Sequence, residues 1–246
     1  MTRRHLWVKI VSMENNSQKV LLFDIDGTLL EPAGIGRKCC QRALEDVLGY
    51  SISTDHVEMA GRTDWQILND LLSHAGLDDA QIESRRKAVF DALARHISTA
   101  APTSKMHPLP GVLALMESLK GDQRFLLGLV TGNSQGIVVH KLRAVGIDPG
   151  LFAVGAFGDD HFDRNALPAL ALYRLSQLIG RQVPPEKVLV IGDTPHDIAC
   201  AQHTGLKVLS VATGVFNITD LEKHQPTYLL EDLSDIEAVL RIFQEF

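Results

Sequence analysis

The stretch VLLFDIDGTLL at residues 20–30 decides the fold class of this chain. Its first four residues are apolar, which predicts a buried strand. Two carboxylates, Asp24 and Asp26, follow where the run breaks at Gly27. Ligands of open α/β sheets bind outside the carboxyl ends of the strands, and two acids buried together need a cation, a proton or a ligand to offset their repulsion. The stretch therefore predicts a strand that delivers two acids to a ligand site; a solvated Asp-Gly turn at a strand end is the alternative.

The rest of the chain alternates apolar runs with helical patterns. Further buried strands are predicted at residues 125–130, 152–156, 188–191 and 207–211. Strands that alternate with helices form βαβ units, so we expect an α/β protein with a parallel sheet between two layers of helices. A closing amphipathic helix is expected at residues 233–246, with Ser234 as its N-cap.

One long interval interrupts this alternation. No strand pattern occurs between residues 33 and 103, whereas helical patterns do. They occupy residues 37–48, 63–74 and 79–96. So long a run of helices does not fit a single crossover between neighbouring strands. We therefore expect a helical cap at residues 33–103, inserted into an α/β core formed by residues 19–32 and 104–246. Residues 1–18 are expected to be a flexible N-terminal extension.

Composition narrows the possible partners. With 246 residues, 45% of them hydrophobic, the chain is long enough for a full core. Its formal net charge of −6 gives no electrostatic footprint for nucleic acid and argues against an anionic membrane surface. No apolar stretch is long enough to span a membrane, and the three cysteines form no disulfide framework, which favours a reducing cytoplasm. We therefore expect a cytoplasmic monomer or homodimer that binds neither nucleic acid nor membrane.

A second polar group follows the strand predicted at residues 125–130. Thr131, Gly132 and Asn133 stand between this strand and a helix, where backbone N–H groups are left free. Helix N-termini attract anions. The segment is therefore a candidate anion-binding loop or, as the alternative, an ordinary capped helix start.

A third polar group follows the strand predicted at residues 188–191. Asp193 can project past the sheet as Asp24 does, and Asp197 lies near the start of the next helix. Mg²⁺ prefers carboxylate oxygens and retains waters, so these two acids and Asp24 are candidate ligands. Asp193 alone is also a plausible helix N-cap. Three separate strand ends that each carry an acid or a threonine argue against coincidence.

Arg164 lies between the third and fourth predicted strands. A cation near clustered carboxylates and a phosphate would offset their repulsion, and arginine suits phosphate through its bidentate fork. The alternative is a surface arginine near a helix start, since such residues are common.

These pieces, in this order, resemble the haloacid dehalogenase (HAD) superfamily of phosphohydrolases. The resemblance rests on three motifs: D-x-D-G-T-L at residues 24–29, T-G-N at 131–133 and G-D-x-x-x-D at 192–197. The helical insertion is similar to the cap of the phosphoglycolate phosphatase-like and β-phosphoglucomutase-like members. The resemblance implies a Rossmann-like, three-layer core with strand order 5-4-1-2-3. It also implies Mg²⁺-dependent hydrolysis of a small organic phosphomonoester, a phosphorylated metabolite, through an aspartyl-phosphate.

The resemblance also implies roles for the residues that match these motifs. Asp24 would be the nucleophile, and Asp26 would be the general acid and base. Mg²⁺ would be held by Asp24, the backbone carbonyl of Asp26 and Asp193, while Asp197 orients the metal shell. Thr131, with the backbone of the Gly132 and Asn133 segment, would hold the transferring phosphoryl oxygens.

The chain departs from the family at the basic residue, which is usually a lysine. Arg164 is the best candidate for this role. Lys141 and Lys187 are worse placed, because one lies in the helix after the second strand and the other leads into the fourth strand.

The predicted cap contributes the segment Gly61-Arg62-Thr63-Asp64. Arg62 is expected to reach towards a substrate anion. An alternative, compatible with it, is that Thr63 or Asp64 caps the helix that follows.

Three other functions are alternatives to phosphatase activity. A sugar-phosphate mutase of the same superfamily would share Asp24 and Asp26, so the motifs do not exclude it. A phospho-receiver also uses acids, a threonine and a basic residue around Mg²⁺, but its phosphoacceptor follows the third strand. A catalytically silent binding protein is the third alternative.

Overall fold

The structure is a computed structural model that describes residues 18–246. A six-stranded parallel sheet forms its centre, with the order β5-β4-β1-β6-β7-β8. The strands are β1 (Lys19–Phe23), β4 (Phe125–Val130), β5 (Val154–Ala156), β6 (Val188–Gly192), β7 (Lys207–Val211) and β8 (Tyr228–Leu230). The five expected strands take the order that the resemblance implies. The sixth strand, β8, was not expected, because an apolar run of three residues is too short to show a strand pattern, and these residues are only half-buried.

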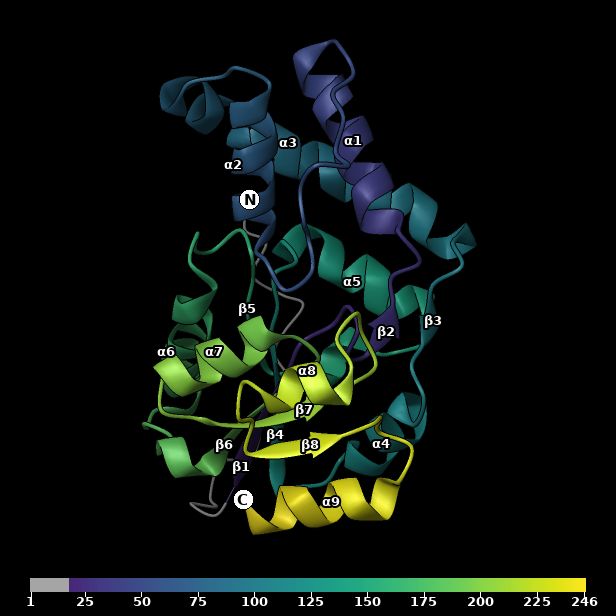
Figure 1. The fold of residues 1–246 in the computed structure, drawn as a ribbon. Helices are drawn as coiled ribbons and strands as arrows, with labels where there is room; N and C mark the ends of the chain where they lie inside the picture. The colour runs from purple at the N-terminus through teal and green to yellow at the C-terminus, as the bar shows by residue number, and fades with distance from the viewer. Residues whose placement is uncertain (1–17) are drawn as a thin grey trace.

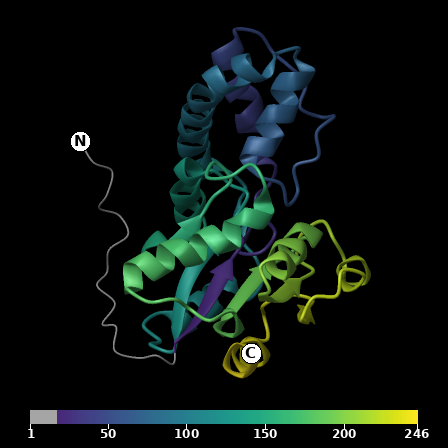
Figure 2. The same ribbon diagram turned by 90° about the vertical axis from the view of Figure 1, so that its left-hand side faces the viewer.

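Two layers of helices cover the faces of this sheet (Figures 1 and 2). The helices are α4 (Val112–Leu119), α5 (Gln135–Ala144), α6 (Leu167–Ile179), α7 (Pro195–His203), α8 (Ile218–Glu222) and α9 (Ile236–Glu245). Helices α4, α5 and α9 share one apolar cluster with one face of the sheet, whereas α6, α7 and α8 share a second cluster with the other face. The expected three-layer α/β architecture is therefore confirmed.

The alternation of side chains along β1 explains why both faces are buried. Leu21 and Phe23 belong to the first cluster, while Val20 and Leu22 belong to the second. Strands that are covered on both sides have continuous apolar sequences, which is why residues 20–23 predicted a buried strand. Parallel pairing with β4 and β6 places β1 at the centre of the sheet, so that its carboxyl end lies between two neighbouring strand ends.

A helical insertion separates β1 from β4. It contains α1 (Ile35–Leu48), α2 (Asp64–His74) and α3 (Asp79–Ala100), and these helices stand beyond the carboxyl end of the sheet (Figures 1 and 2). A short antiparallel pair, β2 (Leu30–Glu31) with β3 (His107–Pro108), joins the two chain segments that lead into and out of the insertion. Two-residue strands have no readable periodicity, so the sequence did not predict this pair. The domain boundaries at residues 33 and 103 stay a prediction.

Some boundaries differ from the expected ones. Helix α9 begins at Ile236, and its N-cap is Asp235, whose carboxylate accepts a hydrogen bond from the N–H of Ala238 at 3.0 Å. The prediction of Ser234 as N-cap is therefore wrong, and its hydroxyl bonds to Asp232 instead. The expected extension at residues 1–18 lies, except for its last residue, outside the described part of the chain. Among the described helices, none combines the length and the apolar character needed to cross a membrane.

Candidate active site

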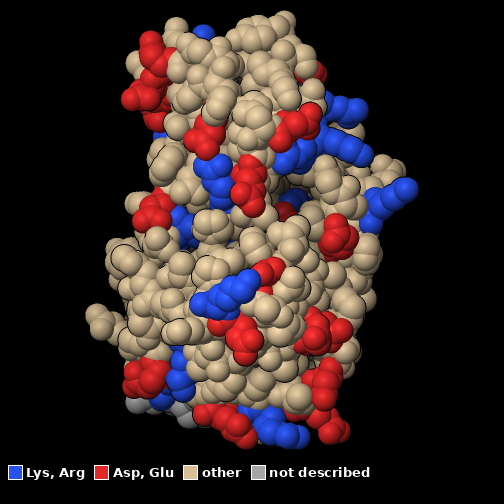
Figure 3. Space-filling model, in the orientation of Figure 1, with Lys and Arg blue, Asp and Glu red and all other residues tan. Residues whose placement is uncertain are grey.

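A cavity of about 350 Å³ lies between the carboxyl end of the sheet and the helical insertion. Figure 3 shows the hollow between these two parts of the surface, with acidic and basic atoms visible inside it. The lining includes the candidate site residues Asp24, Asp26, Arg62, Thr131, Gly132, Asn133, Arg164 and Asp193. The insertion adds apolar side chains, among them Ile67, Leu68 and Leu93. The cavity therefore combines a charged floor with a largely apolar upper wall.

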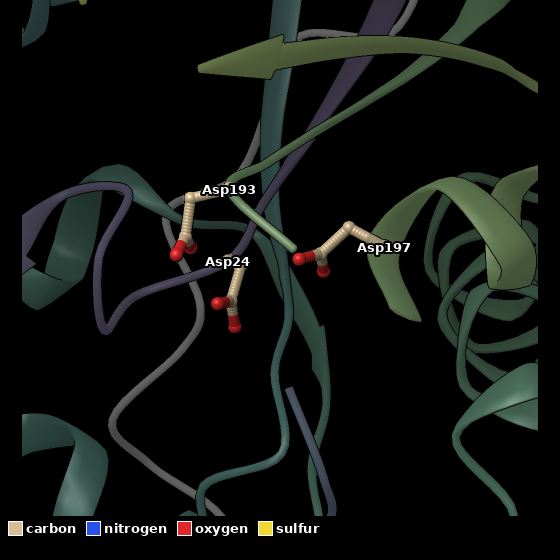
Figure 4. Close-up of side chains that lie close together, drawn as sticks. All are labelled: Asp24, Asp193 and Asp197. Atoms are coloured by element: carbon tan, nitrogen blue, oxygen red, sulfur yellow. The ribbon is translucent and has the colours of Figure 1, made fainter. Parts of the chain in front are cut away.

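Three carboxylates meet at the floor of this cavity. Asp24 follows β1, Asp193 follows β6, and Asp197 lies in the first turn of α7. One oxygen of each lies within 4.8 Å of one oxygen of the other two, and the residues are only 4%, 2% and 0% exposed. Figure 4 shows the three side chains gathered at the strand ends. This arrangement concentrates negative charge where water is largely excluded.

The cluster fits a hard divalent cation. Burial raises the pKa of Asp24 to about 7, although the nearby Arg164 guanidinium opposes the rise. Burial, then the charges of Asp197 and Asp24, raise the pKa of Asp193 well above its ordinary value. One oxygen of Asp24, Oδ1, is also buried and accepts no hydrogen bond from the described residues. Carboxylate oxygens that repel one another, one of them with an ion-pair contact to Arg164 at 3.3 Å but no hydrogen bond, are suitable ligands for a cation such as Mg²⁺.

One glycine and one threonine explain how Asp193 is placed so close to the end of β1. Gly27 has φ = 84°, a conformation that favours glycine, and a Cβ atom there would lie 2.2 Å from Oδ2 of Asp193. The next residue, Thr28, donates a hydrogen bond from its hydroxyl to Oδ1 of Asp193 at 2.9 Å. The G-T pair after the two acids of the first strand therefore makes room for Asp193 and orients it.

Thr194, not Asp193, caps helix α7. The Thr194 hydroxyl accepts a hydrogen bond from the N–H of Asp197, and Oδ2 of Asp197 accepts bonds from the Thr194 N–H at 3.0 Å and hydroxyl at 2.6 Å. This capping box fixes Asp197. The alternative reading of Asp193 as the N-cap is therefore wrong, and the Asp193 carboxylate is left for the cavity.

Arg164 reaches the same cluster from the turn that precedes α6. It is 4% exposed, and its Nη2 lies 3.3 Å from Oδ1 of Asp24 and contacts Oδ1 of Asp197. Burial lowers the pKa of Arg164, but the charges of Asp197 and Asp24 raise it more, to above the ordinary value. The arginine therefore stays charged and offsets part of the repulsion between the acids. It is not a surface residue.

The hydrogen-bonding groups of the loop after β4 are paired within the protein to a greater extent than the sequence suggested. The Thr131 hydroxyl accepts hydrogen bonds from the N–H and the side-chain amide of Asn133, at 3.3 and 2.9 Å. The N–H of Ser134 donates to Oδ2 of Asp64 at 2.7 Å, and the N–H of Gln135 donates to Asp159 at 2.8 Å. The backbone N–H groups of Ser134 and Gln135 at this helix start are therefore already paired with acids, while the anion-binding role of Thr131, Gly132 and Asn133 stays a prediction.

The segment from Gly61 to Asp64 lies directly against this loop. The N–H of Asp64 donates to the carbonyl of Gly132 at 2.7 Å, and a Cβ on Gly132 would lie 2.0 Å from the carbonyl oxygen of Arg62. Thr63 caps α2 in a capping box with Gln66, so of the two expected caps Thr63 is the one observed. Helix α2 is therefore held against the strand ends through its first turn.

Arg62 lines the cavity, but its guanidinium is already paired. Its Nη2 lies 2.6 Å from Oδ2 of Asp70, and its Nη1 donates to the carbonyl of Glu58 at 3.3 Å. The expected contact with a substrate anion would have to compete with this ion pair.

The sequence did not lead us to predict that Lys141 is part of the site. Its side chain is 1% exposed, and its Nζ lies 2.5 Å from Oδ2 of Asp26 and 2.6 Å from Oδ1 of Asn133. The lysine was set aside because it lies in a helix well after the strand end. A signal was available, since Ile137, Val138, Lys141 and Leu142 form the buried stripe of α5. A lysine at an apolar position of a stripe requires a buried partner.

The comparisons with known proteins agree with this geometry. A family model described as haloacid dehalogenase-like hydrolase matches residues 21–211. The protein therefore belongs to this hydrolase family, as the motifs indicated.

Related proteins match over nearly the whole chain. The pyrophosphatase PpaX of Bacillus pumilus is 25% identical over 232 residues, which are 93% of this chain and 99% of that protein. A phosphoglycolate phosphatase of Colwellia psychrerythraea is 24% identical over 234 residues, with coverage of 93% and 100%. A crystal structure described as a predicted phosphoglycolate phosphatase from Haemophilus somnus superposes with a TM-score of 0.65, at 24% identity and with coverage of 91% and 98%. This structural likeness supports the same fold.

Proposed function

We propose that this protein is a Mg²⁺-dependent phosphatase that hydrolyses a small organic phosphomonoester through a phosphoaspartate on Asp24. One observation carries the proposal: Asp24 and Asp26, two residues apart, stand in different environments. Asp24 lies in the buried carboxylate cluster beside Arg164, whereas the Asp26 side chain turns to Lys141 and keeps 32% of its surface exposed. Two carboxyl groups with different surroundings are suited to different chemical tasks.

In the proposed reaction, a carboxylate oxygen of Asp24 attacks phosphorus and forms an acyl phosphate. The bond between phosphorus and the ester oxygen breaks, the oxygen keeps the bonding electron pair, and the carboxyl group of Asp26 gives that oxygen a proton. The Asp26 carboxylate then takes a proton from a water molecule as the water attacks the phosphoaspartate. Inorganic phosphate leaves, and Asp24 is restored. A covalent intermediate of this kind splits one difficult displacement into two easier steps.

Asp24, Asp193 and the backbone carbonyl of Asp26 would hold Mg²⁺, with Asp197 orienting this group from α7. When bound, the ion neutralises negative charge on the phosphoryl oxygens and on the carboxylates. Arg164 supplies a second positive charge at the same place. Thr131 and the Gly132 segment, which line the cavity beside Asp24, are proposed to contact the phosphoryl oxygens.

The helical insertion, proposed as a cap over residues 33–103, would surround the remainder of the substrate and exclude water. The cavity is of a size suited to a small molecule. The relatives are named for phosphoglycolate and pyrophosphate, both of which are small phosphates. These observations support a small phosphorylated metabolite as the substrate.

A panel of phosphate esters tests the proposal directly. The purified full-length chain is incubated with p-nitrophenyl phosphate, phosphoglycolate, sugar phosphates and pyrophosphate, with Mg²⁺ or with EDTA. Released phosphate is measured. We expect release from at least one ester that depends on the metal. No release from any compound at any metal concentration would contradict the proposed function.

A further inference from the structure

The position of Lys141 has a chemical consequence for Asp26. An ammonium group that is removed from water is costly unless it is paired and hydrogen-bonded. Lys141 is fully inside the protein, on the buried stripe of α5, where leucine or methionine would pack at lower cost. Its two hydrogen-bond acceptors, Asp26 and Asn133, come from two loops that precede α5 in the chain.

These contacts belong to a continuous chain of hydrogen bonds. Lys141 bridges the Asp26 carboxylate to Oδ1 of Asn133, and the amide of Asn133 donates to the hydroxyl of Thr131 at 2.9 Å. The network joins the loop after β1 to the loop after β4. It therefore fixes the side chain of Asp26 relative to Thr131, which lies beside Asp24.

The bridge leaves Asp26 open to the cavity. About a third of the Asp26 side chain, 32%, is exposed, although one of its oxygens is held by Lys141. Asp26 and Lys141 both line the cavity. The other oxygen, Oδ1, is buried and has no hydrogen-bond partner among the described residues. The carboxyl group is therefore anchored through Oδ2, while Oδ1 is left unpaired for exchange of a proton with a bound molecule.

We propose that Lys141 is a positioning residue that holds the carboxyl group of Asp26 against the phosphate loop, at the place where it meets the leaving-group oxygen. This inference rests on the proposed phosphatase function. The proton that reaches the ester oxygen comes from Asp26, and Lys141 takes no part in the transfer. Loss of Lys141 affects the step in which the bond to the leaving group breaks, and affects it most when the leaving oxygen needs a proton.

Leaving-group dependence separates this role from a merely structural one. The nitrophenolate of p-nitrophenyl phosphate departs without protonation, whereas the alkoxide of benzyl phosphate requires a proton. We expect Lys141→Met to lower kcat/KM for benzyl phosphate at least about tenfold more than kcat/KM for p-nitrophenyl phosphate, because general acid catalysis contributes roughly 10²–10⁴-fold. The ratio kcat/KM is compared because it reports the step in which the leaving group departs, whereas hydrolysis of the phosphoaspartate is the same for both esters.

Two further variants complete the test. Arg143→Met, on the exposed side of the same helix, is the matched control and should leave both rates unchanged. In an Asp26→Asn background, Lys141→Met should cause no additional loss, since residues that act as a unit are not additive. Lys141→Gln keeps a hydrogen-bond donor without the charge, and it replaces the methionine variant if thermal melting shows that the latter does not fold.

The outcomes are distinct. An equal loss of kcat/KM for both esters, or additive losses with Asp26→Asn, would overturn the positioning role while leaving the phosphatase function intact. A wild-type protein that releases no phosphate from any ester would instead refute the proposed function, and this inference with it.

Discussion

Nη2 of Arg164 lies 3.3 Å from Oδ1 of Asp24, and the same nitrogen contacts Asp197. All three side chains are at most 5% exposed. We predict that the arginine takes the role of the lysine that the motifs lead one to expect, and it reaches two of the three clustered acids at once. One planar guanidinium therefore serves both the acid proposed as nucleophile and the acid proposed to orient the metal shell.

Replacement of Arg164 tests this relationship. We expect Arg164→Ala to lower kcat/KM for p-nitrophenyl phosphate by at least about 100-fold, because removal of one group that stabilises charge in the transition state typically costs roughly 10²–10³-fold in rate. Arg164→Lys should recover only part of the activity, since an ammonium lacks the fork that reaches both acids.

Arg124→Ala is the matched control for this substitution. It removes an arginine whose ion pair with Asp122 lies on the surface, so activity should not change. Activity of Arg164→Ala within a few-fold of the wild type would show that Arg164 has no part in turnover.

The raised pKa values predict a pH-dependent response to metal. Asp24 has a pKa of about 7 in the folded protein, above its ordinary value, so the folded state binds more protons than the unfolded state between about pH 4 and 7. Its contribution to stability is therefore present at low pH and is lost as the pH rises towards 7. A cation competes with these protons, so Mg²⁺ should stabilise the protein more at pH 8 than at pH 5.

Thermal melting with Mg²⁺ and with EDTA measures this effect. At a metal concentration 100 times Kd, the gain at pH 8 is about 2.7 kcal/mol, which raises Tm by roughly 5–10 °C in a chain of this size. Asp193→Asn should remove most of the gain. An equal Mg²⁺ effect at both pH values would contradict the assignment of the cluster as a metal site.

We predict that the side chain of Asp64 holds the helical insertion against the sheet. Its carboxylate accepts a hydrogen bond from the N–H of Ser134 at the start of α5. Asp64→Ala should therefore increase hydrogen exchange both at Ser134 and in residues 61–64, and should raise KM, with a loss of stability of about 1–3 kcal/mol for the unsatisfied donor.

Asp159→Ala provides the control, because Asp159 accepts a bond from Gln135 at the same helix end but lies outside the insertion. This variant should loosen the helix start and leave exchange in residues 61–64 unchanged. Identical exchange patterns in the two variants would show that Asp64 does not hold the insertion.

The choice between phosphatase and mutase depends on the fate of the phosphoryl group. We expect steady release of inorganic phosphate with no requirement for a sugar bisphosphate. Conversion of β-glucose 1-phosphate to the 6-phosphate that needs such an activator, with little free phosphate, would favour the mutase. Chromatography of the sugar products beside a phosphate assay distinguishes the two.

The sequence predicted the sheet well because its central strands are buried on both faces. Their apolar runs are continuous, and their ends carry the acids and threonine of the site. Strand β8 was missed because it is short and half-buried at the sheet edge. The β2–β3 pair was missed because pairing of two residues depends on where the chain folds back, which local sequence does not encode.

The side-chain environment of the site was harder to predict than its position. Asp24 and Asp193 come together because strand ends in a parallel sheet meet at one edge. Lys141 reaches Asp26 from the second turn of α5, and Asp64 reaches Ser134 from the insertion. Such contacts depend on how packed elements face each other, so spacing along the chain did not indicate them. The ion pair of Arg62 with Asp70 was not foreseen for the same reason.

The central claim is that Asp24 is the nucleophile, and Asp24→Asn tests it most directly. The substitution keeps the size of the side chain and removes a buried charge, so the variant should fold with an unchanged or higher Tm. Phosphate release from the best ester in Mg²⁺ should fall by at least about 10³-fold, because an amide oxygen is a poor nucleophile towards phosphorus. A folded Asp24→Asn variant that keeps turnover within tenfold of the wild type would contradict the account.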